Sequence, residues 1–234
     1  MPDTKWTPSR RAFLLATVAT IPAVTLSGSL LPSGSKAFAA DQAGYTPVFF
    51  TQSEWAFVNA FVDRLIPADA EGPGALELNV PVFIDLQMGL PYGYGKLWYM
   101  GGPFRTAAPS LGYQLPYAPR DIYRNGIAAA EQAIQQAYGK SFTDLDAAAR
   151  DEVITRMQKG KLAMAPVPSD VFFDQILQNT QEGYFSDPVH GGNRDMGAWK
   201  MIGFPGARAD FTDFINQNGA KYPYGPVSIK DQGI

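Results

Sequence analysis

The chain of 234 residues contains no cysteine and a single histidine, His190. Without cysteine the protein can form no disulfide bond, hold no iron–sulfur cluster through thiolates and attach no c-type haem through a Cys-x-x-Cys-His motif. A zinc site needs three or four Cys, His or carboxylate ligands, so a lone imidazole argues against zinc. The fold must therefore be stabilised by packing alone.

Glycine-rich nucleotide motifs are also missing. The pair Gly93 and Gly95 lacks the third glycine of a dinucleotide-binding loop, and no phosphate-binding loop occurs. Sustained alternation of apolar and polar residues, which is typical of β-strands, is absent as well. These gaps argue against a dinucleotide-binding fold and against a β-rich domain.

The first 39 residues are typical of an export signal rather than of a folded domain. They combine an arginine pair, a nearby aromatic residue and small residues before the expected cleavage site: Arg10, Arg11, Phe13, Ala37 and Ala39. The apolar run over residues 12–31 is diluted by Ser, Thr, Gly and Pro, which argues against a permanent membrane anchor. We therefore predict a cleavable twin-arginine signal peptide, residues 1–39, and delivery to the periplasm.

The remaining domain, residues 40–234, is acidic. The whole chain has 19 basic and 22 acidic residues, and the signal removes four basic residues and one acidic residue. The domain thus keeps 15 basic and 21 acidic residues, a net charge of −6. Nucleic acids and anionic membranes attract clustered Lys and Arg, and no such cluster is found. This balance argues against a nucleic-acid partner.

Apolar residues recur at helical spacing along the domain, which predicts a mainly α fold. The expected helices cover residues 52–66, a short stretch after Asn79, residues 123–139, a stretch from Thr143 or Asp144 to Gly160, residues 169–183 and, as a short sixth helix, residues 209–216. Thr51 and Glu54 form a capping box that opens the first helix. The pattern indicates a single irregular helical domain.

Two long segments interrupt this regularity. Residues 89–119, here called the aromatic loop, are rich in Tyr, Trp and Phe, and residues 183–208, here called the glycine-rich segment, contain the lone histidine. Both are too aromatic for flexible linkers, so we expect ordered loops. The rings of the aromatic loop can stack on a sugar, pack against the helices or form a protein interface. Trp98, Tyr99 and Met100 belong to the residue types that interfaces favour.

Candidate catalytic groups in the glycine-rich segment have simpler explanations. His190 is the one side chain suited to general base catalysis near neutral pH, but no nucleophile accompanies it, so a bond to backbone or to a partner is favoured. Asp187, Asn193 and Asp195 lack the spacing of a calcium-binding hand, and loop carboxylates usually cap turns. A calcium site remains the less favoured alternative.

Three stretches of the domain resemble a known family: residues 71–85, residues 123–127 with 139–142, and residues 182–206. They are similar to the small subunits (gamma, or subunit 3) of bacterial membrane-bound gluconate 2-dehydrogenases and related flavin-dependent sugar dehydrogenases. The resemblance extends over nearly the whole domain. Residues 98–104 look most like the gluconate-type members.

The resemblance implies a complex of three kinds of subunit. A large subunit carries FAD and oxidises the sugar acid, and a cytochrome c subunit with several haems passes electrons to ubiquinone in the cytoplasmic membrane. The small subunit is expected to have no cofactor and no catalytic residue, and to support export and maturation of the large one. We therefore expect membrane contact only through the complex, at the outer face of the cytoplasmic membrane.

A folded-export signal on a chain without a cofactor motif suits an escort that carries an untagged flavoprotein through the twin-arginine translocase. Five residues of the glycine-rich segment are then expected to fix its shape and meet the large subunit: Tyr184, Phe185, His190, Arg194 and Trp199. The alternative is an autonomous periplasmic sugar-acid-binding protein or enzyme with its pocket between residues 89–119 and 183–208. Gluconate turnover or saturable gluconate binding by the isolated chain distinguishes the two.

Overall fold

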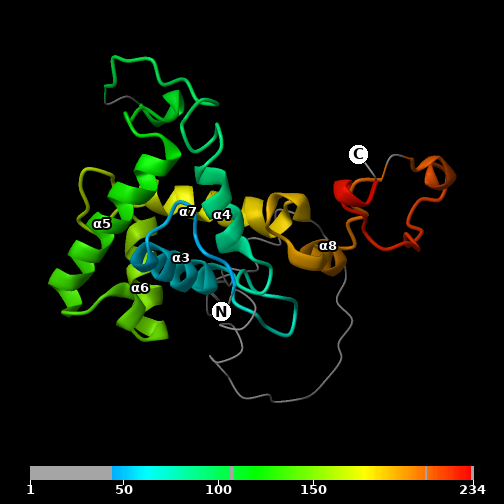
Figure 1. Cartoon of the computed structure of the whole chain (residues 1–234), viewed down its shortest axis with the longest axis horizontal. Helices are drawn as coiled ribbons and strands as arrows, with labels where there is room; N and C mark the ends of the chain where they lie inside the picture. Colours follow the sequence, from blue (N-terminus) through cyan, green and yellow to red (C-terminus); the bar gives the residue numbers. More distant parts are fainter. Residues whose placement is uncertain (1–43, 106–107, 209, 233–234) are drawn as a thin grey trace, which may run out of the picture. The chain divides into compact units, whose positions relative to one another are not determined.

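The computed structural model describes residues 44–105, 108–208 and 210–232, so the predicted signal peptide, residues 1–39, lies outside the described residues. The described part contains six α-helices and no β-strand, which confirms the mainly α prediction. The helices are α3 (Gln52–Leu65), α4 (Val80–Met88), α5 (Pro119–Tyr138), α6 (Ala147–Gln158), α7 (Ser169–Phe185) and α8 (Gly197–Ile202), as Figure 1 shows. Four short 3-10 helices lie between them, η1 (Pro109–Leu111), η2 (Phe142–Asp144), η3 (Pro188–His190) and η4 (Arg194–Met196), and two follow α8, η5 (Thr212–Phe214) and η6 (Ile229–Gln232).

Helix α7 is the common packing partner and contacts α3, α4, α5, α6 and α8. Its buried Phe172 lies near the rings of Phe57 and Phe61 on α3, with centroids 6.1 and 6.4 Å away. On α5, Gly126 approaches the Phe172 ring so closely that a Cβ atom would lie 2.2 Å from it. Glycine at this position therefore allows α5 to pack directly on α7.

A buried carboxylate ties the first described residues to α4. Asp85 is fully buried and accepts a hydrogen bond of 2.6 Å from the Tyr45 hydroxyl. The Asp85 carboxylate also accepts hydrogen bonds from three backbone N–H groups, those of Val48, Phe49 and Phe50, at 2.7, 3.0 and 2.9 Å. Burial, together with the bond to Asp85, raises the pKa of Tyr45 well above its usual range. The four donors offset the cost of burying the charge, so the chain enters the bundle at a fixed place.

Helix α3 begins as the sequence predicts. The Glu54 backbone N–H donates to Thr51 Oγ1 at 3.3 Å, and the Thr51 backbone N–H donates to Glu54 Oε2 at 2.8 Å. Helix α7 begins at the predicted Ser169 and runs to Phe185, two residues beyond the predicted end at Gly183. Both helices had clear apolar periodicity, which explains the agreement.

The start of α6 was predicted wrongly, and α5 begins earlier than its apolar pattern alone indicates. Helix α6 begins at Ala147 because Asp146 caps it by accepting a hydrogen bond of 2.8 Å from the Ala149 backbone N–H, while Thr143 and Asp144 belong to η2. Helix α5 begins at Pro119, four residues before the first periodic apolar residue. Proline is favoured in the first helical turn, where its missing N–H costs nothing.

The structure also corrects the shortest elements. Asn79 precedes α4, but its backbone is left-handed with φ of 56° and its side chain makes no capping hydrogen bond. The described residues of the predicted helix over 209–216 contain only the 3-10 turn η5. Helix α8 lies within the glycine-rich segment, where no helix was predicted.

Candidate docking surface

The aromatic loop is attached to the backbone of both helices that it joins. It ends one residue earlier than predicted, because Pro119 already belongs to α5. Gly93 lies against the end of α4, where a Cβ atom would be 2.4 Å from the Met88 carbonyl oxygen. The carbonyl oxygen of Gly93 accepts a hydrogen bond of 3.2 Å from the Arg120 backbone N–H of α5. The base of the loop is therefore fixed.

Tyr92 anchors the loop to the middle of α7. Its hydroxyl oxygen accepts hydrogen bonds from Gln175 Nε2 at 2.7 Å and from Asn179 Nδ2 at 2.8 Å. Asn179 Oδ1 accepts a further bond of 3.2 Å from the hydroxyl of Tyr123 on α5. Burial raises the pKa of Tyr92 and outweighs the opposite effect of the two amide donors, so the hydroxyl is neutral at neutral pH. Each amide nitrogen also has a second acceptor, Asn179 Oδ1 for Gln175 and Glu182 Oε2 for Asn179, so Tyr92 is one member of a connected polar network.

Aromatic rings lead outward from this anchor. Trp98 meets Tyr92 edge to face with centroids 6.2 Å apart and packs on Tyr113 at 5.0 Å. The Tyr113 hydroxyl donates to the Tyr117 carbonyl oxygen at 2.7 Å, and burial raises the pKa of Tyr113 to about 12. Ring pairs at these separations attract one another, so they support the outer part of the loop.

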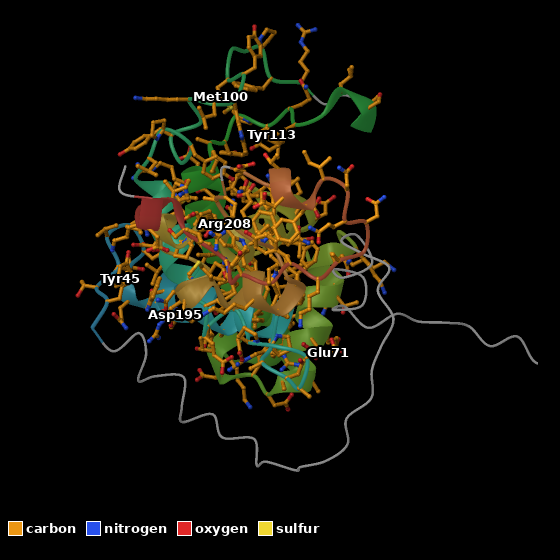
Figure 2. The ribbon with its side chains drawn as sticks, turned by 90° about the vertical axis from the view of Figure 1, so that its right-hand side faces the viewer. Tyr45, Glu71, Met100, Tyr113, Asp195 and Arg208 are labelled. Carbon is orange, nitrogen blue, oxygen red and sulfur yellow. The ribbon has the colours of Figure 1, made fainter. Side chains whose placement is uncertain are left out.

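Large apolar side chains of the aromatic loop face solvent. Tyr99 is 92% exposed, Leu97 72% and Leu111 67%. Figure 2 shows Met100 and Tyr113 of this loop close together at the end of the domain opposite Glu71. Exposed apolar surface gathered in one place marks an interaction site more often than scattered exposed residues do.

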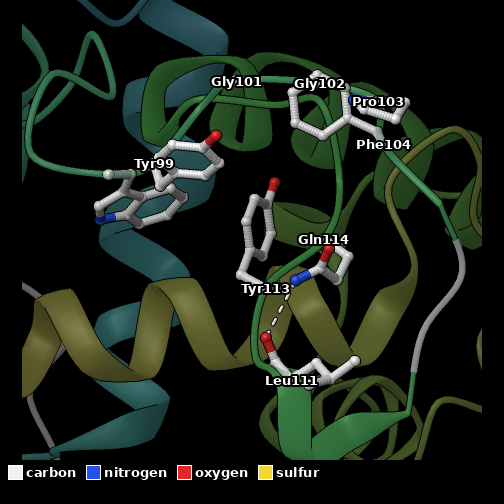
Figure 3. Close-up of a pocket in the computed structure, with 9 residues that line it drawn as sticks. Tyr99, Gly101, Gly102, Pro103, Phe104, Leu111, Tyr113 and Gln114 are labelled. Carbon is white, nitrogen blue, oxygen red and sulfur yellow. Dashed lines mark hydrogen bonds between the residues drawn. The ribbon is translucent and has the colours of Figure 1, made fainter.

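Of these side chains, Tyr99, Leu111 and Tyr113 line a groove of about 650 Å³. It is here called the docking groove. Its side-chain walls are Trp98, Tyr99, Phe104, Leu111, Tyr113 and Gln114 (Figure 3). The Gln114 amide donates to the Leu111 carbonyl oxygen at 3.0 Å, which holds that wall in place. A groove of this size and ring content can receive large apolar side chains of a partner.

The glycine-rich segment uses its rings differently. Tyr184 and Trp199 are only 2% and 6% exposed. The Tyr184 hydroxyl donates to the Pro73 carbonyl oxygen at 2.7 Å, and Trp199 Nε1 donates to the Phe185 carbonyl oxygen at 2.9 Å. The Asn193 side chain links the two sides of the segment. Its Nδ2 donates to the Ser186 carbonyl oxygen, and its Oδ1 accepts from the Ala198 backbone N–H, both at 2.9 Å. The segment is thus part of the packed domain.

The other predicted interface residues of this segment are more accessible. His190 ends η3 and is exposed, Phe185 is half-buried with its ring on Tyr184, and Arg194 is half-buried near the carboxylate of Asp195. The structure therefore places Trp98, Tyr99 and Met100 together on one loop, and Tyr184, Phe185 and Trp199 together in the packed segment. A partner interface at these eight residues remains a prediction.

Sequence reasoning did not single out Leu97, Phe104, Leu111, Tyr113 and Gln114 as site residues. They lie in an irregular loop, where no periodicity relates Trp98 to Tyr113. Apart from the polar Gln114, their one common signal is composition: large apolar residues between glycines and prolines.

The possible calcium ligands are used by the chain itself. Asp187 accepts hydrogen bonds from the Ser228 hydroxyl at 2.6 Å and from the backbone N–H groups of Val189 and Ile229 at 3.0 and 2.8 Å. Across the described residues, no three His, Cys, Asp or Glu side chains are grouped as metal ligands. None of the helices in that part of the chain is long and apolar enough to cross a membrane.

The chain is a small helical domain whose aromatic loop is anchored to α7 and carries an exposed apolar groove. A sequence model of the family Gluconate 2-dehydrogenase subunit 3 matches residues 52–206, more than half of the chain, and the chain belongs to this family. The match runs from the start of α3 to just beyond α8, so it includes the aromatic loop and nearly all of the glycine-rich segment. No curated protein and no solved structure matches the chain.

Proposed function

We propose that this chain is the non-catalytic small subunit of a periplasm-facing, membrane-bound gluconate 2-dehydrogenase. In this role it escorts the FAD-containing large subunit through export and stabilises its fold. The observation that carries the proposal is the docking groove, in which Tyr99 is 92% exposed although Tyr92 fixes the same loop to α7. A preorganised apolar surface loses little conformational freedom on binding, which favours a protein partner.

The export part of the proposal rests on the sequence. Arg10 and Arg11 belong to the predicted twin-arginine signal. The twin-arginine route accepts folded proteins, which matters most for a flavoprotein that receives its cofactor before it leaves the cytoplasm. A large subunit without a signal then crosses while it is bound to this chain, so assembly precedes passage through the twin-arginine translocase.

The proposed location is the outer face of the cytoplasmic membrane. FAD and haem c belong to the partner subunits, and a multi-haem cytochrome c subunit passes the electrons from sugar-acid oxidation to ubiquinone. This chain contacts the membrane only through the complex. Its own contribution is binding, which positions and stabilises the large subunit.

The experiment replaces Arg10 and Arg11 together by lysine in cells that contain the whole complex. We expect most of the large subunit, and most gluconate dehydrogenase activity, to move from the periplasm to the cytoplasm although the large subunit is unchanged. Immunoblots and activity of the cell fractions measure the effect. The control changes Lys140 and Lys161 to arginine, two exposed residues of the folded domain, and should leave the distribution as in the wild type. Normal periplasmic activity in the Arg10 and Arg11 variant would refute the escort role.

The purified mature subunit provides a second test. Titration with gluconate by calorimetry, and assay with an artificial electron acceptor, should give neither saturable binding nor turnover. Saturable binding at the docking groove would favour the sugar-acid-binding alternative, because rings beside an amide such as that of Gln114 can also hold a sugar. Turnover by the isolated chain would show that it is an enzyme.

A further inference from the structure

The aromatic loop differs in charge from the rest of the domain. Between Asp85 and Asp121 the sequence contains Lys96, Arg105 and Arg120 but no Asp or Glu. Residues 86–120 therefore carry a net charge of +3, whereas the rest of residues 40–234 has 12 basic and 21 acidic residues, a net charge of −9. Within residues 40–234 this is the longest stretch without an acidic residue, and it contains the whole aromatic loop.

Two of the three cations are available to a partner. Lys96 and Arg105 are exposed, and Arg105 directly follows Phe104 in the wall of the docking groove. Arg120 is less accessible, because its guanidinium stacks on the rings of Tyr94 and Phe49 at 4.1 and 5.0 Å from their centroids. Lys96 and Arg105 therefore lie within two residues of the groove walls Trp98 and Phe104 in the sequence, and the loop itself contains no carboxylate, although Asp121 at the start of α5 acts on Tyr113.

We propose that the docking groove binds a segment of the large subunit in which a large apolar side chain is flanked by Asp or Glu. This inference rests on the proposed function and adds the chemistry of the partner surface. The apolar side chain enters between Tyr99, Phe104 and Tyr113, and the flanking carboxylates approach Lys96 and Arg105. Buried aromatic anchors supply affinity, while the outer charge pairs mainly increase the association rate and the specificity.

An anionic membrane surface is the other acidic partner that basic and aromatic residues can suggest. Two observations favour the protein segment. The surface is a groove of about 650 Å³ rather than a protruding apolar tip, so it suits an inserted side chain. The remainder of the domain carries a net charge of −9 and would be repelled by anionic lipid.

The test measures association of the purified small subunit, as exported, with the purified large subunit at about 50 mM and about 300 mM salt. For the wild type we expect clearly tighter binding at low salt. The double variant Lys96→Glu with Arg105→Glu should bind about tenfold more weakly at low salt and lose most of the salt dependence. The control variant Lys140→Glu with Lys161→Glu has the same charge change on exposed residues elsewhere, and should bind like the wild type.

A second pair of variants tests the apolar part. Tyr99→Ser and Leu111→Ser should each weaken binding about tenfold while the salt dependence is retained. Thermal unfolding of every variant verifies the fold, and little change is expected because all four altered side chains of the loop are exposed.

The outcomes separate the two proposals. If the wild-type subunits do not associate at any salt concentration, the proposed function fails. If they associate and the variant with both charge reversals binds as the wild type does, the acidic partner segment is refuted while the escort role stands. If that variant binds normally but no longer sediments with phosphatidylglycerol vesicles that capture the wild type, the loop is a membrane contact and the inference is overturned.

Discussion

The aromatic loop and the glycine-rich segment are both rich in glycine and aromatic residues but differ in how far their rings are buried. Both combine rings with glycines and lie largely outside the long helices, although the glycine-rich segment begins with the last three residues of α7. In the glycine-rich segment Tyr184 and Trp199 are 2% and 6% exposed, whereas Tyr99 of the aromatic loop is 92% exposed. Aromatic content alone therefore does not tell a packed segment from a docking surface.

Close backbone contacts account for the difference. In the glycine-rich segment a Cβ atom on Gly192 would lie 2.2 Å from the Gly183 carbonyl oxygen, so the chain folds directly onto the end of α7. Its rings are then enclosed by the chain on several sides. The aromatic loop makes one such approach, at Gly93, and beyond Tyr92 its rings pack mainly on one another. The glycine-rich segment is therefore part of the core, whereas the aromatic loop is attached to the outside of it.

The largest expected effect comes from removing one ring from each region. Trp199→Ala deletes a buried ring and leaves the Phe185 carbonyl oxygen without its indole donor, so the free energy of unfolding should fall by about 3–5 kcal/mol. Tyr99→Ala removes an exposed ring and should change the same quantity by less than about 0.5 kcal/mol. Urea denaturation of the purified subunit gives both values.

When association with the large subunit is measured, Tyr99→Ala should have the larger effect and Trp199→Ala the smaller one. Tyr99→Ala should weaken association with the large subunit although its stability is normal. Equal losses of stability in the two variants would contradict the assignment of one region to the core and the other to docking.

The second prediction concerns the anchor of the aromatic loop. Tyr92→Phe removes one acceptor of the Gln175 and Asn179 amides, each of which keeps another, so the free energy of unfolding should fall by about 0.5–1.5 kcal/mol. The loop should also become easier to cleave, which limited proteolysis with mass spectrometry can locate within residues 89–118. Tyr99→Phe removes a hydroxyl from an exposed ring of the same loop and serves as the control. Unchanged stability and cleavage in Tyr92→Phe would show that the loop is held by other contacts.

Sequence predicted the elements whose signals are local. The capping box of Thr51 and Glu54 and the apolar periodicity of α3 and α7 lie within the helices themselves, so those helices were placed nearly correctly. Helix α8 could not be found in this way. It has six residues, and the Asn193 side chain that caps its Ala198 N–H lies in a turn where Asn193, Asp195 and Met196 are all left-handed. Such a turn is set by tertiary packing rather than by residue preference.

As with the helices, the sequence predicted only those parts of the candidate site that residue type alone indicates. Interface-forming residue types drew attention to Trp98, Tyr99 and Met100, which border or adjoin the docking groove. The anchor of that loop was not predictable, because Tyr92 reaches Asn179 across 87 positions of sequence. Nor could composition reveal that Tyr184 and Trp199 are buried, since burial depends on how α7 and α8 meet.

The smallest expected effect concerns a carboxylate of the glycine-rich segment that ties down the C-terminal residues. Burial alone would raise the pKa of Asp187, but hydrogen bonds from Ser228, Val189 and Ile229, together with the nearby His190, outweigh it and lower the pKa. A carboxyl group with a lowered folded-state pKa stabilises the fold above its unfolded pKa of about 3.9 and loses that effect as the pH falls through the folded value.

Asp187→Asn should therefore be less stable than the wild type by an amount that is constant from about pH 7 to about pH 5 and shrinks below about pH 4. The free energy of unfolding, measured by urea denaturation across this range, gives the difference at each pH. Asp195→Asn changes an exposed carboxylate of the same segment and should show a smaller difference throughout. A gap between Asp187→Asn and the wild type that persists unchanged at low pH would mean that the carboxylate charge does not hold the C-terminal residues. The C-terminal residues would then be held by contacts other than the charge of Asp187.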